Sequence, residues 1–96
     1  MSIDWLDRMA AVVRVLAHRH RLKMIERLEQ RRTAPVFELA EAAGLPAAAA
    51  SQHLNQLKRV GLVRSVRRGK EVWYAIADRR ALTILGCMRK QYRSTP

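Results

Sequence analysis

The segment from Ser51 to Lys58 concentrates side chains that could hydrogen-bond with nucleic acid. Gln52 and Asn55 carry amides, which pair with adenine through two hydrogen bonds, and the Ser51 hydroxyl can donate or accept. His53 and Lys58 lie further along and are better placed for phosphates. A helix fits the major groove and presents its first half to the base edges, so the segment predicts a DNA-reading helix. For His53, an imidazole held in an internal hydrogen bond is the alternative.

Basic residues continue past this segment, and no acid interrupts them between Ser51 and Lys70. They are Lys58, Arg59, Arg64, Arg67, Arg68 and Lys70. Such a stretch is typical of phosphate contacts and ends in a tip, residues 67–70, that would reach the DNA backbone or minor groove. An ordinary solvated surface is the alternative. The whole chain of 96 residues carries 19 Lys and Arg against 8 Asp and Glu, a net charge of +11, which predicts a polyanionic partner.

Two amphipathic helices are predicted ahead of this region. Apolar residues spaced by three and four predict the first helix over Ile3–Ala17. A second stripe begins after the cluster His18-Arg19-His20 and is marked by Leu22, Ile25 and Leu28. The second helix should end in the polar, basic run before Pro35, because basic residues suit a helix C-terminus.

A helix-turn-helix is predicted next. Its first helix runs from about Pro35 to Ala43 and is ended by Gly44, and its second runs from about Ala47 to Val60. The residues expected to face inward are Phe37, Leu39 and Ala40 in the first helix and Ala50, Leu54 and Leu57 in the second. Two helices joined by a tight turn that holds glycine are the signature of this motif.

The periodicity then changes from helical to alternating. Val72, Tyr74 and Ile76 alternate with other residues, which predicts a strand with one buried face. This strand pairs with Leu62–Arg67 across a turn at residues 68–70 to form a hairpin. Asp78 is a suitable N-cap for a final helix, one face of which carries Leu82, Leu85, Met88 and Tyr92. The predicted fold class is therefore mainly α with a β-hairpin: a winged helix-turn-helix of four helices, a hairpin wing and a C-terminal helix.

Several short motifs follow one another in this part of the chain. They are Leu39-Ala40-Glu41-Ala42-Ala43-Gly44-Leu45, Ser51-Gln52-His53-Leu54, Leu57-Lys58, Gly61-Leu62-Val63 and Gly69 with Val72 and Tyr74, preceded by Leu16-Ala17 with Arg21-Leu22. Together they resemble the ArsR/SmtB family of bacterial transcription regulators over about residues 12–90. The resemblance implies a homodimer that binds double-stranded DNA and represses transcription by blocking polymerase, and not an enzyme.

The chain departs from the family pattern at two places. The recognition helix starts with Pro46-Ala47-Ala48-Ala49-Ala50, where relatives usually carry polar residues. Alanine cannot hydrogen-bond a base, so this helix should make fewer direct contacts with base edges. Many relatives bind metals through two cysteines spaced two apart, and the matching positions here are Pro35 and Phe37. His18 and His20 would point to different sides of a helix, so neither a metal nor a cofactor is expected. Cys87 is a candidate redox group, and a buried apolar role is its alternative.

The sequence predicts one domain over residues 1–96, with DNA read by about residues 35–77. The first and last helices are expected to form the dimer interface through Leu6, Met9, Val13, Leu82, Leu85, Met88 and Tyr92. One cysteine and no apolar run near the roughly 18 residues of a membrane span favour a cytoplasmic protein with no membrane partner. The expected function is sequence-specific repression by a homodimer on a palindromic promoter operator. The alternatives are a winged-helix module for a protein or RNA partner and an architectural DNA binder of low specificity.

Overall fold

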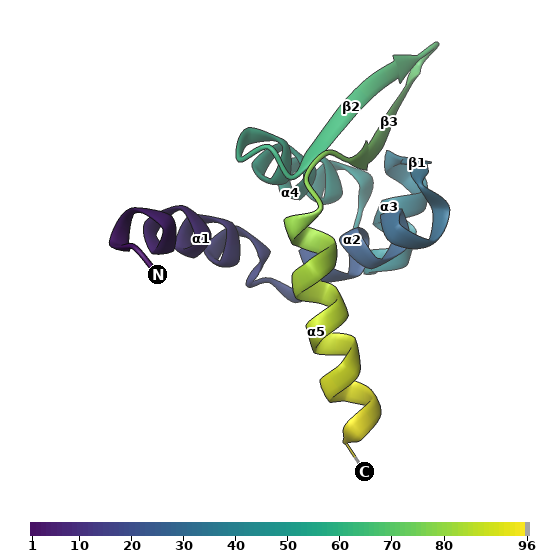
Figure 1. Cartoon of the computed structure of the whole chain (residues 1–96). Coiled ribbons are helices and arrows are strands. Elements are labelled where there is room, and N and C mark those ends of the chain that lie inside the picture. Colours follow the sequence, from purple (N-terminus) through teal and green to yellow (C-terminus); the bar gives the residue numbers. More distant parts are fainter. Residues whose placement is uncertain (96) are drawn as a thin grey trace.

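A computed structural model describes residues 1–95 of the chain, and its elements follow the predicted order with one addition (Figure 1). The elements are α1 (Ile3–Leu16), α2 (Arg19–Arg31), β1 (Thr33–Pro35), α3 (Val36–Ala43), α4 (Ala47–Arg59), β2 (Val63–Arg68), β3 (Glu71–Ile76) and α5 (Arg80–Ser94). The prediction of four helices, a hairpin and a final helix is confirmed. No helix in residues 1–95 combines the length and the apolar character needed to cross a membrane.

The addition is the short strand β1, which turns the hairpin into a three-stranded antiparallel sheet of order β1-β3-β2. In its register Thr33 lies opposite Ala75, and Pro35 lies opposite Trp73. Three residues are too few to show an alternating pattern. Proline has no N–H for the ladder and is tolerated at a sheet edge, which is where β1 lies. Strand β1 was therefore not predicted from the sequence.

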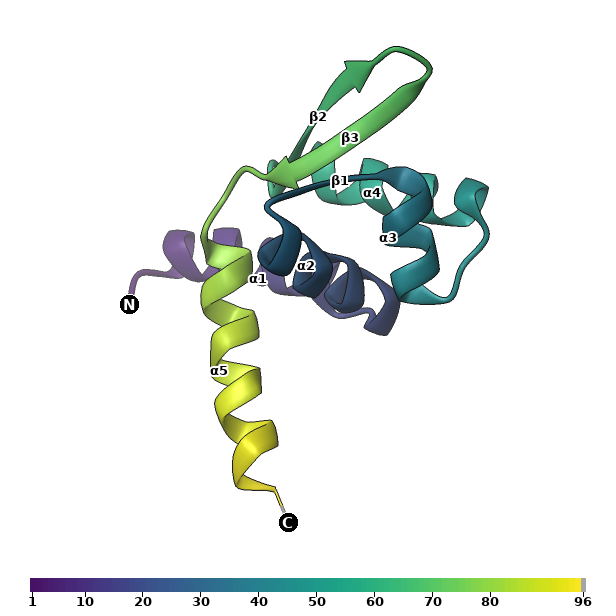
Figure 2. The ribbon, with the colours of Figure 1, turned by 90° about the vertical axis from the view of Figure 1, so that its right-hand side faces the viewer.

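The core lies between the sheet and helices α2, α3 and α4 (Figure 2). Its fully buried large side chains are Met24, Ile25, Leu28, Leu39, Leu54, Leu57, Leu62 and Val63. The inward positions predicted for α4 are confirmed, but Phe37 is 61% exposed and the prediction that it faces inward is wrong. Phe37 is two residues before the buried Leu39, which places it about 200° away around the helix.

Helices α1 and α5 project from this core in different directions (Figures 1 and 2). In α1 the buried residues are Val12 and Leu16, near its end, and in α5 they are Ala81 and Leu85, near its start. Each helix is therefore anchored at one end and leaves much of its length without intramolecular cover.

Candidate nucleic-acid interface

Helix α4 presents its polar side chains to solvent because its opposite side is fixed in the core. Ala50, Leu54 and Leu57 are fully buried, while Gln52 and Asn55 are exposed. The preceding turn is tight, since Gly44 ends α3 in the left-handed conformation at φ 71°. This arrangement can place the amides predicted to read bases on the outer surface of a recognition helix.

His53 takes the internal role that the sequence analysis gave as the alternative. Arg21 Nε donates to His53 Nδ1 at 3.0 Å, and Arg21 Nη1 donates to the Val15 carbonyl at 3.0 Å. One guanidinium thus joins the recognition helix to the junction between α1 and α2. The accepting Nδ1 atom carries no proton, so the imidazole is neutral in this arrangement.

His18 and His20 gather with His53, and the prediction that they point to different sides is wrong. The His18 ring lies 4.4 Å from that of His53 and 5.4 Å from that of His20, centroid to centroid. Helical spacing does not apply to this pair because His18 precedes the helix. His18 is the N-cap of α2, and its Nδ1 accepts from the His20 backbone N–H at 3.3 Å.

The hydrogen bonds of His18 and His53 suit neutral imidazoles. Burial, followed by the charge of Arg21, lowers the pKa of His18 below its ordinary value of 6.5. The pKa of His53 is lowered by burial, then by His18 and Arg21. The Nδ1 atoms of His18 and His53 both accept hydrogen bonds, so the neutral rings carry their proton on Nε2. A metal would need a free lone pair on that nitrogen. Among residues 1–95 no group of three or more His, Cys, Asp or Glu side chains is arranged to hold a metal ion.

The sheet register divides the basic residues of the hairpin between two faces. Directly paired residues share a face of the sheet. Arg64 pairs with Ala75 and Arg68 pairs with Glu71, and both arginines lie on one face. Arg67, which pairs with Val72, lies on the opposite face. The face of Arg67 also carries Ser65, whose hydroxyl accepts from Lys58 Nζ at 2.7 Å. The recognition helix is therefore tied to one face of the wing, and Arg67 extends from that face toward the tip.

Comparisons with known proteins agree with this geometry. Residues 16–66, more than half of the chain, match the family described as a helix-turn-helix domain. Over 73 residues the chain is 37% identical to the HTH-type transcriptional repressor SmtB of Mycobacterium tuberculosis, an alignment that covers 76% of this chain and 53% of that protein. The chain belongs to the ArsR/SmtB family of winged helix-turn-helix regulators. This is a family of DNA-binding transcription regulators, not of enzymes, and the chain spans about half the length of the curated relatives it matches first.

Solved structures show the same ArsR/SmtB fold. The antimony-specific transcriptional repressor AntR superposes with a TM-score of 0.86 at 25% identity, over 98% of this chain and 87% of that chain. A homodimeric winged helix-turn-helix DNA-binding domain from Mycobacterium bovis gives a TM-score of 0.80 at 29% identity, over 97% and 88% of the two chains. The fold expected from the motifs is confirmed.

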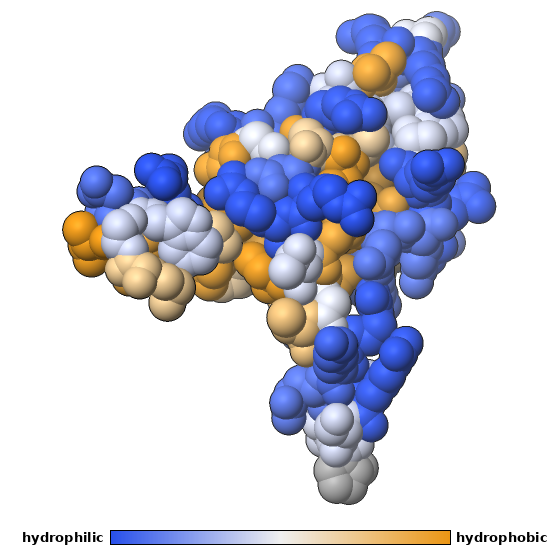
Figure 3. Space-filling view, in the orientation of Figure 1, coloured by the Kyte–Doolittle hydropathy of each residue, from blue (hydrophilic) through white to orange (hydrophobic). Residues whose placement is uncertain are grey.

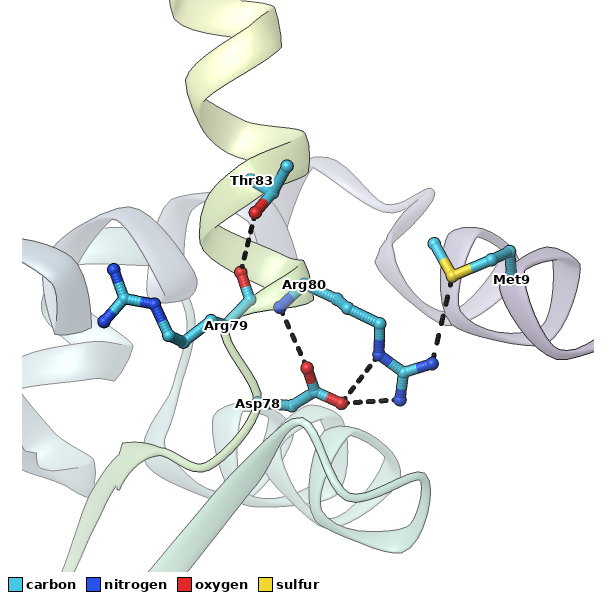
Figure 4. Close-up of polar contacts among 5 residues, drawn as sticks. All are labelled: Met9, Asp78, Arg79, Arg80 and Thr83. Atoms are coloured by element: carbon cyan, nitrogen blue, oxygen red, sulfur yellow. Dashed lines mark hydrogen bonds and ion pairs between the residues drawn. The ribbon is translucent and has the colours of Figure 1, made fainter. Parts of the chain in front are cut away.

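In this ArsR/SmtB-family chain a polar link joins the wing to both projecting helices (Figure 4). Asp78 accepts from Arg80 Nε at 2.7 Å and from the Arg80 backbone N–H at 2.9 Å, and these bonds lower the pKa of its carboxyl. Arg80 Nη1 lies 3.9 Å from Met9 Sδ on α1. Asp78 was the predicted N-cap; the N-cap position is Arg79, one residue later, but the Asp78 carboxylate still satisfies an N–H of the first turn.

The apolar residues predicted for a dimer interface fall into two groups. Leu85 is buried and Leu82 packs against the core, so these two side chains serve the protomer itself. Val13 is 49% exposed and Tyr92 81% exposed, and Leu6 and Met88 are exposed as well. Ile3 and Trp5, which the sequence analysis passed over, are also exposed on α1. Figure 3 shows apolar side chains at the outer end of α1 and along the upper part of α5. Cys87 is exposed in the protomer, so it is not part of the protomer's core.

Proposed function

We propose that this chain is a transcriptional repressor that acts as a homodimer on an imperfectly palindromic operator. The observation that carries the proposal is the surface of α4, where Gln52 and Asn55 point to solvent from a helix whose other side is locked in the core. Bound across a promoter, such a dimer would exclude polymerase. A repressor of this kind would act in the bacterial cytoplasm, where the chromosome lies.

The roles of the predicted DNA contacts follow from their positions. Gln52, Asn55 and the half-buried Ser51 would meet base edges, while Lys58 and Arg67 would meet phosphates on the side of the wing tied to α4. Residues on the other face, and Lys70 at the tip, would add to the positive field around the wing. His53 would act indirectly, by holding α4 through its bond to Arg21.

Dimerisation would place two recognition helices in successive major grooves. Their spacing on B-DNA would be about 34 Å, one helical turn. The exposed apolar stripes of α1 and α5 support this proposal, since a soluble monomer rarely leaves such surface uncovered. A second copy of the chain would cover both stripes.

Direct readout is expected to be modest at the start of α4. Ala47 and Ala48 are exposed there, and alanine offers a base only its methyl group. Discrimination would then depend on the few polar residues of the next turn and on DNA shape.

Two substitutions separate the base-reading role from the phosphate-binding role. Gln52→Ala should lower affinity for the operator by about tenfold and leave binding to a scrambled duplex nearly unchanged, because one bidentate contact is lost. Arg67→Ala should weaken binding to both duplexes and reduce the slope of log K against log salt by about one unit. Arg93→Ala, at the far end of α5, removes the same charge as a control. Equal losses on both duplexes for Gln52→Ala would contradict the base-reading role and favour an architectural or RNA-binding function.

A further inference from the structure

An open groove of about 620 Å³ lies on the outer face of the wing sheet, where the sheet meets the end of α2 and the start of α5. This volume is in the range of small-molecule sites. The residues that give the groove its chemistry are Arg32, Arg64, Arg68, Val66, Trp73 and Leu82. Three guanidinium groups therefore surround a surface that is otherwise aromatic and aliphatic.

The positive charge of the groove is not neutralised from within. Among its lining residues in the described part of the chain, Glu29 is the one acid. The Glu29 carboxylate is held by Arg89 of α5 in an ion pair, so its charge is already matched. The three arginines of the groove remain available to an anion.

Trp73 supplies apolar surface beneath Arg68 and an indole N–H without an acceptor among the described residues. The Arg68 guanidinium lies over its ring, 4.6 Å from the centroid, and Val66, directly opposite it in the sheet, is 54% exposed. The Trp73 Nε1 atom is shielded from solvent and meets no acceptor among residues 1–95. A buried N–H without a partner costs free energy, which an oxygen supplied by a ligand would recover.

Arg32 occupies a backbone conformation that favours glycine. Its φ is 68°, and in residues 1–95 it is the one non-glycine residue with positive φ. Glycine adopts positive φ at no steric cost, because it has no Cβ. The chain instead carries at this point a long cationic side chain that lines the groove, and strained residues of this kind often lie at ligand sites.

We propose that this groove binds a small one-ring aromatic carboxylate whose occupancy weakens DNA binding. The ring would lie on the apolar surface at Trp73 and Val66, and the carboxylate would pair with the guanidinium groups of Arg32 and Arg64. The exposed apolar surface favours an organic ring over a bare phosphate. DNA bound at α4 would approach the other face of the sheet, where Lys58 bonds to Ser65.

The regulatory part of this inference rests on the proposed function. A bound carboxylate would neutralise guanidinium charge on the wing and lower the positive potential that attracts phosphates. If the carboxylate lowers the affinity of the protein for DNA by a given factor, then bound DNA lowers the affinity of the protein for the carboxylate by the same factor. We expect a factor of about five, at the low end of measured couplings.

Phenylacetate is a suitable probe because it is a one-ring carboxylate whose own fluorescence does not interfere with that of tryptophan. In a Trp5→Phe background Trp73 is the remaining tryptophan of the chain, so its emission reports on the groove. The DNA-free protein should show a saturable change with a Kd below about 1 mM. Phenylacetamide, which lacks the charge, and acetate, which lacks the ring, should not reproduce it.

Three variants locate the site. Arg32→Gly and Arg64→Ala should each weaken phenylacetate binding by about fivefold or more, the loss expected when a charge-assisted hydrogen bond is removed. Arg93→Ala should leave it unchanged. Arg32→Gly should also keep or raise the melting temperature, because it relieves the positive-φ strain, and its loss of binding would then not come from unfolding.

Different outcomes test the ligand site and its effect on DNA binding. No saturable change up to about 10 mM phenylacetate, an equal response to acetate, or equal affinity in all variants would overturn the inference. If the original chain does not bind phenylacetate and Arg64→Ala weakens DNA binding, the inference is also overturned and the groove is assigned to DNA. Because the titration needs no DNA, it decides the ligand site even if the proposed repressor function fails. Unchanged operator affinity at saturating phenylacetate would contradict the regulatory part alone.

Discussion

His18 is a single residue that links the pH of the solution to the start of α2. Its neutral imidazole caps the helix, and its pKa is below 6.5 in the folded protein. In the unfolded chain the residue takes up a proton near pH 6.5. The folded protein should therefore be most stable above pH 6.5 and lose stability as the pH falls from there to the lower, folded-state pKa. His53, with its pKa lowered as well, acts in the same direction.

The substitution His18→Asn tests this directly. Asparagine is also a good N-cap but does not titrate, so the variant should fold at neutral pH with a smaller loss of stability between about pH 7 and pH 5. Urea unfolding at several pH values measures the difference. A variant whose pH dependence equals that of the original chain would show that the charge of His18 is unimportant. His53→Asn gives a second estimate at the other end of the cluster.

Residue roles were predictable where they depend on exposure along a helix and were missed where they depend on long-range contacts. The spacing of buried residues in α4 correctly placed Ala50, Leu54 and Leu57 in the core. The bond from Arg21 to His53 joins residues 32 positions apart, and no local pattern indicates it. The groove arginines likewise come from distant parts of the chain, Arg32 from the residue after α2 and the other two from β2.

The turn between α3 and α4 is the element that sets the angle of the recognition helix. Gly44 adopts φ 71°, and an added Cβ would meet no atom within 4 Å, so conformation and not space requires glycine here. Gly44→Ala should lower the free energy of unfolding by about 1 kcal/mol. Gly44→Asn should cost about half as much, since asparagine tolerates the left-handed region better. Equal stability of all three proteins in thermal unfolding would contradict this assignment.

Element types and their approximate bounds were predictable from sequence, and the third strand of the sheet was not. The spacing of the hydrophobic residues predicted the helices and β3, because each of these elements buries one face, and β2 was predicted as the hairpin partner of β3. Strand β1 has no such periodicity, since its three residues are ordered by pairing with the distant Ala75, Tyr74 and Trp73. The two faces of the wing could be assigned only once this pairing was known.

At the scale of the whole molecule, the exposed stripes of α1 and α5 predict a dimer. Val13→Glu places a charge on the apolar side of α1 and should give a monomer at micromolar concentration in sedimentation velocity. Its operator affinity should fall by about a hundredfold, because the second half-site is no longer bound in the same complex. Ala11→Glu puts the same charge on the polar side of α1 and should change neither property. A dimer that survives Val13→Glu with full affinity would place the interface elsewhere.

The central claim is that the surface of α4 and the wing reads a DNA sequence. Fluorescence anisotropy of the protein on the DNA upstream of its own gene, beside a scrambled duplex of equal composition, measures this at low and at high salt. The account predicts that the upstream duplex binds about a hundredfold more tightly and that this ratio persists at the higher salt. Equal affinities that fall together as salt rises would show a protein that binds phosphates without reading sequence, and would contradict the repressor function.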